Sequence, residues 1–137
     1  MPCASGRRDL TALAAFLDAR AAMPHDWDGN CCVRFAFGAV AAQFGAAPDP
    51  GADWHDRRSA RRAIAKVGGI AAQMDRLFAP AATALAKRGD IAAVEDEAHG
   101  ILLAVVEGDT LACPGFDGTM RYPRRAMIAA WSAEPLT

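Results

Sequence analysis

The sequence has no long apolar segment and no marked excess of charge of either sign. No uninterrupted apolar run is longer than that of residues 101–106, which is far short of the roughly 20 residues that a membrane-spanning helix needs. Residues 1–9 contain no apolar core typical of a signal peptide. With 15 Lys+Arg against 16 Asp+Glu, the net charge is −1, which argues against a nucleic-acid binder that depends on many phosphate contacts. We therefore expect no membrane span, no nucleic-acid partner and no export by the usual secretory route.

Cysteines spaced for metal binding are also lacking. None of the four cysteines belongs to a Cys-x-x-Cys pair, and the three histidines are scattered along the chain. Adjacent cysteines such as Cys31 and Cys32 do not easily share one tetrahedral metal ion. A disulfide framework is not expected without secretion. We therefore predict no metal site and no cofactor.

The composition is that of a single packed domain. Hydrophobic residues make up 53% and charged residues 23% of the 137 residues, so the chain is too apolar and too nearly neutral to be disordered. This length suits one domain. We predict one domain over residues 1–137, in which residues 1–8 form a flexible N-terminal segment.

The best-defined predicted element is a helix from Asn30 or Cys31 to Phe44. Its apolar residues recur with helical spacing on one face. Asn30 is a suitable N-cap and Gly45 a suitable C-terminal stop. The other predicted helices cover residues 9–20, with Asp9 as N-cap, residues 59–67, and a short segment with Met74, Leu77 and Phe78.

The second half of the chain has short apolar runs typical of strands. Residues 107–109 resemble a hairpin turn, and Pro123 is placed to begin a final helix with Met127, Ile128 and Trp131. Since helices come first and strands follow, we predict an α+β fold with N-terminal helices on a small antiparallel sheet. The predicted strands are residues 91–95, 101–106, 110–113 and 120–122.

Two cysteines at a helix start are the main chemical signal. Free N–H groups there favour an anion, and the thiolate is the nucleophilic form of cysteine. His99 directly precedes a predicted strand, and an adjacent imidazole would activate the sulfur. A cysteine in such a place can equally be a buried packing residue.

Several motifs occur in the order found in the NlpC-type branch of the papain-like cysteine peptidases and in related phage-tail and prophage proteins, which this sequence resembles over residues 10–131. They are Trp27-Asp-Gly-Asn-Cys-Cys32-Val-Arg-Phe35 with Gly45, Gly68-Gly69, Gly89-Asp90-Ile91, His99 before Gly100-Ile101-Leu102-Leu103, and the closing segment from Pro123 to Trp131.

The resemblance implies a papain-like fold with Cys32 as nucleophile and His99 as its base. Cys31 stands where the family has Asp, and it remains the alternative nucleophile. The strand that carries the imidazole-orienting residue in the family reads Thr110-Leu-Ala-Cys113 here, without His, Asn, Gln or Asp. A backbone carbonyl could orient the ring instead.

Other residues are candidates for lining the same cleft. Trp27 and Trp54 are predicted to bind substrate, although both could be core anchors. His25 could face the cleft as well. The acidic turn 95–97 would raise the pKa of His99 if it lies close. Four arginines of one predicted helix form either a solvated face or a surface for an acidic partner: Arg57, Arg58, Arg61 and Arg62.

Two function classes follow from the resemblance. The first is a phage- or prophage-associated cysteine peptidase or amidase that acts on peptidoglycan peptides. The second is a tail assembly protein that keeps the fold without catalysis and binds other tail subunits. Acyl transfer or deamidation of a protein substrate is a third option. In each case we expect synthesis in the bacterial cytoplasm and, for a virion component, assembly into a phage or phage-like tail.

Overall fold

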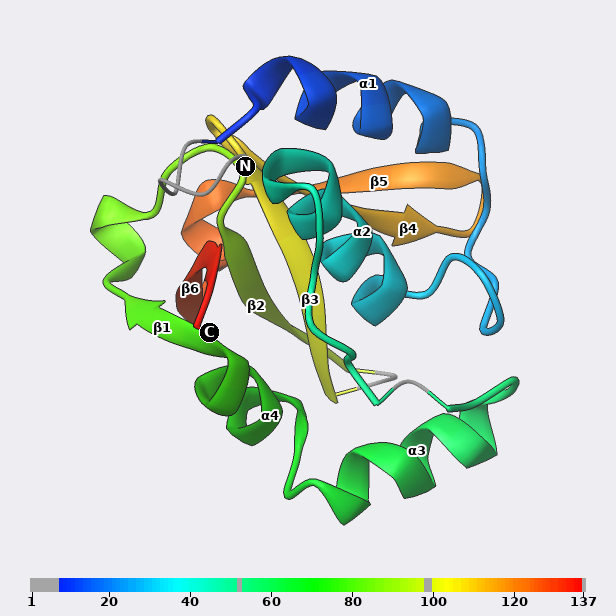
Figure 1. Ribbon diagram of the computed structural model, residues 1–137. Helices are drawn as coiled ribbons and strands as arrows, with labels where there is room; N and C mark the ends of the chain where they lie inside the picture. Colours follow the sequence, from blue (N-terminus) through cyan, green and yellow to red (C-terminus); the bar gives the residue numbers. More distant parts are fainter. Residues whose placement is uncertain (1–7, 52, 98–99, 137) are drawn as a thin grey trace.

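The computed structural model describes residues 8–51, 53–97 and 100–136 (Figure 1). In these residues four α-helices precede the sheet in the chain: α1 (Leu10–Arg20), α2 (Cys32–Phe44), α3 (Arg57–Lys66) and α4 (Ile70–Leu77). The strands are β1 (Phe78–Ala81), β2 (Ile91–Asp96), β3 (Gly100–Glu107), β4 (Thr110–Gly115), β5 (Gly118–Pro123) and β6 (Ala129–Pro135). Two 3₁₀ turns, η2 (Thr83–Leu85) and η3 (Arg124–Ala126), connect strands.

The six strands form one antiparallel sheet in the order β1-β6-β2-β3-β4-β5. The predicted α+β class, with helices packed on an antiparallel sheet, is therefore confirmed. Strands β3 and β4 pair only over Val105–Glu107 and Thr110–Ala112. Beyond this short ladder, β4 and β5 run at a wide angle to β2 and β3 (Figure 1).

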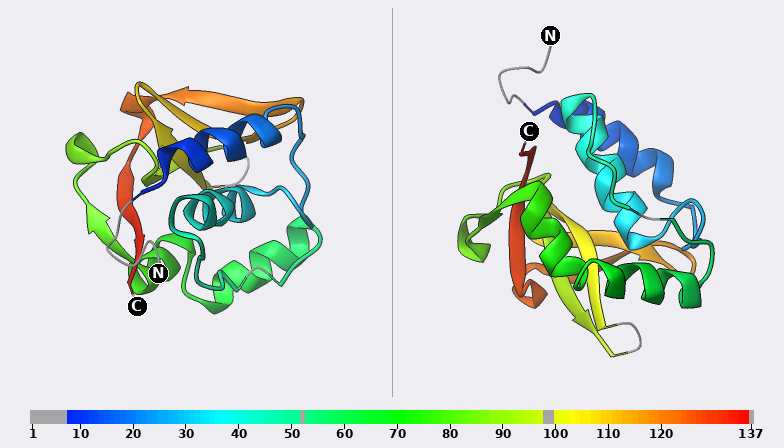
Figure 2. Two further views of the ribbon diagram at one scale, coloured as in Figure 1. Left: turned by 45° about the horizontal axis from the view of Figure 1, so that its top comes forward. Right: turned by 60° about the horizontal axis from the view of Figure 1, so that its bottom comes forward.

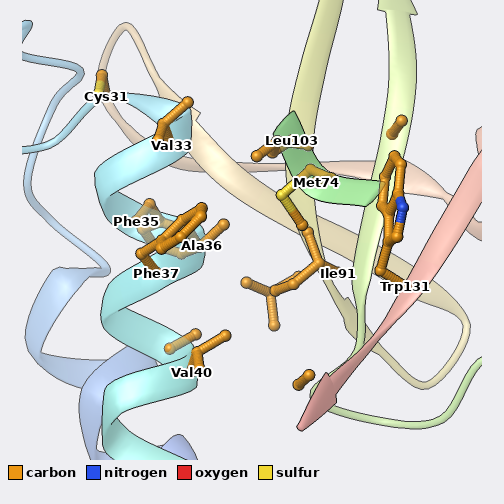
Figure 3. Close-up of a cluster of buried hydrophobic side chains, with 14 of the residues drawn as sticks. Cys31, Val33, Phe35, Ala36, Phe37, Val40, Met74, Ile91, Leu103 and Trp131 are labelled. Carbon is orange, nitrogen blue, oxygen red and sulfur yellow. The ribbon is translucent and has the colours of Figure 1, made fainter. Parts of the chain in front are cut away.

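Helix α2 packs on one face of the sheet. Its side chains Val33, Phe37 and Val40 point towards Ile91 and Leu103 of the two central strands (Figure 3). Helix α1 lies alongside α2 on the same side of the sheet (Figures 1 and 2). The apolar stripe that predicted α2 is thus the surface that it buries.

The opposite face of the sheet has a smaller core of its own. Alternate residues of the central strands, among them Val94, Ala104 and Val106, are completely buried there. Met127, which follows η3, packs in the same cluster. Because successive side chains of a strand point to opposite faces, each central strand supplies both cores.

The predicted final helix is wrong. Pro123 ends β5, and after the single turn η3 the chain forms β6 instead. Strand β6 pairs with β1 on one side and β2 on the other, and Trp131 lies opposite both Pro80 and Ile91. The spacing of Met127, Ile128 and Trp131 is compatible with a helix, but two neighbouring strands satisfy the backbone here and bury Trp131.

The remaining predicted helices are largely confirmed. Asp9 caps α1 by accepting from the backbone N–H of Ala12 at 2.9 Å, and Gly45 ends α2 in the left-handed conformation. Helix α3 begins at Arg57, before the predicted start, because Asp56 and Ser59 form a capping box. Phe78, predicted in the short helix, begins β1 instead.

Most of the predicted N-terminal segment lies outside the described residues. Arg8 is described, and it is anchored: its guanidinium pairs with the buried Asp90 at 2.5 Å and donates to the carbonyl of Arg88 at 2.8 Å. The flexibility of residues 1–8 stays a prediction. Within the described part of the chain, no helix has the length and apolarity required to span a bilayer.

Candidate functional site

Cys31 and Cys32 take different positions at the start of α2. Cys31 is the N-cap, and its sulfur accepts from the backbone N–H of Arg34 at 3.5 Å. Only 1% of Cys31 is exposed. Cys32, the first residue of the helix, is half-buried. Asn30, the predicted N-cap, therefore lies one residue too early for that function.

Burial dominates the ionisation of Cys32 and raises the pKa of its thiol to about 12. The backbone N–H groups of Leu103, Val33 and Cys32 itself oppose this rise, whereas the neighbouring Cys31 adds to it. The thiol is therefore protonated at neutral pH, and a nucleophilic role would require a base to remove this proton.

Asn30 instead holds the loop that precedes α2. This residue is 1% exposed, and its amide donates to the carbonyls of Met23 and Pro24, both at 3.1 Å. Its side-chain oxygen accepts from Arg20 at 2.7 Å. The loop is thereby fixed immediately before the two cysteines.

The same loop is bonded to the β4–β5 hairpin and carries a histidine. The backbone N–H of His25 donates to the carbonyl of Gly115 at 2.8 Å. The His25 ring meets Trp27 edge-on, with centroids 4.6 Å apart. These bonds place an imidazole and an indole next to the end of β4.

Arg34 holds the two tryptophan segments together. Its guanidinium donates to the carbonyl of Trp27 at 3.4 Å and to that of Trp54 at 3.3 Å. Trp54 is buried, and its indole N–H has no hydrogen-bond partner in the described residues. Arg34 follows Cys32 by two residues, so the same helical turn carries the cysteine and the guanidinium that binds both tryptophan segments.

These elements enclose a cleft of about 320 Å³, within the usual range for small-ligand pockets. Trp27, Trp54 and Phe116 contribute aromatic walls. Among the described residues, the titratable and charged ones that line it are His25, Cys31, Cys32, Arg57, Arg61 and Asp96. In Figure 1 the start of α2 is the end of that helix nearer to α3.

The structure thus brings the sequence-predicted residues Cys32, Trp27 and Trp54 to one cleft. His99 lies outside the described residues, so its predicted part in the site stays a prediction. His25 lines the same cleft and is a second candidate base. No group of three potential metal ligands occurs among residues 8–51, 53–97 and 100–136.

Most lining residues were not assigned to the cleft from the sequence, and Phe116 and Asp96 are two examples. Phe116 is 92% exposed at the tip of the β4–β5 hairpin. Its position between Gly115 and Gly118 was the sequence feature that could have indicated an aromatic residue in an exposed turn. Asp96 ends β2 and lies in the acidic turn that was noted only for its effect on His99.

Cys113 lies in β4, where the resemblance places the residue that orients the imidazole. It is completely buried. Burial, followed by the nearby Cys32 and Asp96, raises the pKa of its thiol to about 12. A protonated thiol is a poor acceptor for an imidazole N–H, so Cys113 is poorly suited to such a function.

Comparison with known proteins places the chain in a family. No curated protein and no solved structure matches it. A family model described as a domain of unknown function, DUF6950, matches residues 7–133. Because this match extends over nearly the whole sequence, the chain belongs to the DUF6950 family.

Proposed function

We propose that the protein is a cysteine hydrolase with a papain-like, NlpC-type arrangement, and that Cys32 is its nucleophile. The observation that carries this proposal is the place of Cys32: a half-buried thiol at the first residue of a long helix, in the wall of an aromatic-lined cleft. The sequence resemblance over residues 10–131 supports the same assignment.

In the proposed reaction the Cys32 sulfur attacks the carbonyl carbon of an amide while its proton passes to an imidazole. The C–N bond then breaks, and the amine leaves with that proton. Water hydrolyses the thioester and restores the thiol. Backbone N–H groups at the start of α2 stabilise the oxyanion. His99 is the proposed base and His25 the alternative.

The proposed substrate is a peptidoglycan stem peptide, and the proposed setting is the tail of a phage, prophage or phage-derived particle. Both come from the sequence resemblance. The volume and aromatic walls of the cleft suit a short peptide.

Hydrolysis of purified peptidoglycan tests the reaction directly. We expect new amino groups to appear with the parent protein and with Cys31→Ser, since serine is also a good N-cap. We expect none with Cys32→Ala. If Cys31→Ser releases no amino groups but Cys32→Ala does, then Cys31 is the nucleophile. If neither the parent nor any variant releases amino groups, the protein is not a peptidoglycan hydrolase.

Alkylation of Cys32 by iodoacetamide, followed by mass spectrometry, tests the cysteine–histidine pair without a substrate. If an imidazole removes the proton, the rate of alkylation rises as that imidazole loses its own proton, at a pH of about 6.5, the usual histidine value. Replacing the base, in His99→Ala or His25→Ala, removes that step. A rate that rises only in alkaline solution in all three proteins would exclude the pair.

A catalytically inactive tail assembly protein is the second candidate. The observation in its favour is Cys113, a buried thiol at the position expected for the imidazole-orienting residue. In that case Cys32 is a packing residue, and Cys32→Ala would leave assembly of the tail particle unchanged.

A further inference from the structure

The loop between α1 and α2 and the β4–β5 turn together form one border of the cleft. Their backbones are joined where His25 donates to the carbonyl of Gly115 at 2.8 Å and Thr119 donates to that of Ala21 at 3.0 Å. The exposed carboxylates on these two segments are Asp26, Asp28 and Asp117. None of the three forms an ion pair with another described residue. We call this border the acidic lip.

Helix α3 forms a second border of the cleft and carries the opposite charge. It contains no acidic residue, and its exposed Arg61 lines the cleft together with Ala60 and Ile64. The exposed Arg62 follows on the same helix. Neither guanidinium makes a hydrogen bond or ion pair with the residues that the structure describes. Arg61 and Arg62, which we call the basic lip, are therefore not paired with the acidic lip of the same molecule.

Exposed apolar side chains accompany the acidic lip. Phe116, in the β4–β5 turn, is 92% exposed, and Met120 and Met23 are 36% and 41% exposed. Phe116 and Met120 also line the cleft. Aromatic and methionine side chains bordered by charged residues are typical of protein–protein interfaces. This composition favours a surface that another protein chain covers.

We propose that a second copy of this chain covers the cleft, with the acidic lip of each copy against the basic lip of the other. Charge complementarity identifies the occupant, because one chain presents both charges on two borders of one cleft. A two-fold axis brings each lip to its complement at the same time, and two-fold dimers are the commonest symmetric oligomers. Phe116 is then buried near the centre of the interface, where aromatic residues contribute most to binding.

The inference goes beyond the proposed function and does not require Cys32 to be a nucleophile. In the dimer each copy closes the cleft of the other, so a ligand reaches Cys32 only in the monomer. Dissociation of the dimer would therefore regulate access to the proposed site.

Charge reversal of either lip tests the contact. In Arg61→Glu/Arg62→Glu and in Asp28→Lys/Asp117→Lys, like charges face each other across the two-fold axis. We expect each variant alone to dimerise at least about 10-fold more weakly than the parent in sedimentation equilibrium, because such charges repel. An equal mixture of the two variants restores opposite charges at both contacts, so we expect a heterodimer with an affinity within about 10-fold of that of the parent. This heterodimer also shows that both variants are folded.

Lys87→Glu/Arg125→Glu is the matched control. It makes the same change in net charge as Arg61→Glu/Arg62→Glu, at two exposed positions that do not line the cleft. We expect this control to dimerise as tightly as the parent. Phe116→Ser leaves all charges in place and should weaken the dimer at least about 10-fold.

Amide hydrogen exchange locates the interface in the parent. Raising the protein concentration through the dissociation constant should slow exchange in residues 23–28 and 115–120 and leave β1 unchanged. Protection elsewhere but not in these two segments would overturn the inference, as would a parent that stays monomeric, equal dimerisation of all charge variants or no heterodimer in the mixture. None of these measurements uses a substrate, so failure of the hydrolase proposal and failure of the dimer are distinguishable.

Discussion

At the scale of single residues, neighbours in the sequence have different environments. Both cysteines line the cleft, but the Cys31 sulfur caps α2 and is buried, whereas Cys32 is half-buried and is the first residue of the helix. Asn30, one residue earlier, binds the loop carbonyls. Three successive residues therefore have different environments: Asn30 supports the loop, Cys31 caps the helix and Cys32 is the candidate nucleophile.

The raised thiol pKa values predict a loss of stability in alkaline solution. Unfolded cysteines ionise near 9, but Cys32 and Cys113 do so near 12 in the folded protein. Between these values the unfolded chain releases more protons, so the free energy of unfolding falls as pH rises. Urea unfolding of the parent and of Cys113→Ala from pH 8 to 11 should show a smaller decline in the variant. Parallel declines would contradict the assignment.

Asn30→Ala should destabilise the fold. It removes three hydrogen bonds from a buried position, which should cost about 2–3 kcal/mol in urea unfolding. Asp28→Ala, an exposed change in the same loop, serves as control and should stay within about 0.5 kcal/mol of the parent. Equal stabilities of the two variants would show that Asn30 does not hold the loop.

At the scale of elements, α2 and the start of β2 meet through one buried amide. The Gln43 side chain donates to Ala39 of its own helix at 3.1 Å and to Gly89 at 2.9 Å. A Cβ at Gly89 would lie 2.1 Å from the Gln43 side-chain oxygen, and its φ is +94°. Gln43 is completely buried and its amide nitrogen makes both of these bonds, so the side chain cannot move aside without losing them.

Gly89→Ala should therefore be far more costly than the same change in an open turn. Gly108, in the β3–β4 hairpin, also has a positive φ, but a Cβ there would meet nothing within 4 Å. We expect about 1 kcal/mol for Gly108→Ala, from backbone strain alone, and more than about 3 kcal/mol for Gly89→Ala. Thermal unfolding measures the loss of stability in both variants. Similar losses would mean that α2 moves away from Gly89 at little cost in free energy.

At the scale of the whole molecule, Asp90 connects three distant parts of the chain. Its carboxylate pairs with Arg8 near the N-terminus, and it accepts from the backbone N–H of Lys87 at 2.8 Å and of Ala133 in β6 at 3.1 Å. It is 2% exposed. The sequence motif Gly89-Asp90-Ile91 is thus a structural junction at the start of β2.

Asp90→Asn should cost about 3 kcal/mol in unfolding free energy, because it leaves the Arg8 charge unpaired and turns an amide towards backbone donors. Glu134→Gln, an exposed carboxylate in β6, is the control and should change stability by less than about 0.5 kcal/mol. If Asp90→Asn is equally mild, the junction is held by its backbone bonds alone.

The sequence by itself determined the elements whose signals are local. Asp9 and Gly45 mark helix ends through their own side chain or backbone freedom, and the stripe of Val33, Phe37 and Val40 sets the buried face of α2. The cysteines at a helix start, with Trp27 shortly before them, were likewise visible in a single short segment.

Only the tertiary structure decided the features that depend on distant partners. Residues 129–135 are a strand because β1 and β2 provide partners on both sides, and no local pattern contains that information. The cleft joins Cys32, Arg61, Asp96 and Phe116 from four separate segments. Their common location follows from the wide angle between β4–β5 and β2–β3 and from the docking of α3. Pairing and burial act between residues far apart in the chain, whereas caps and periodicity act within a few residues.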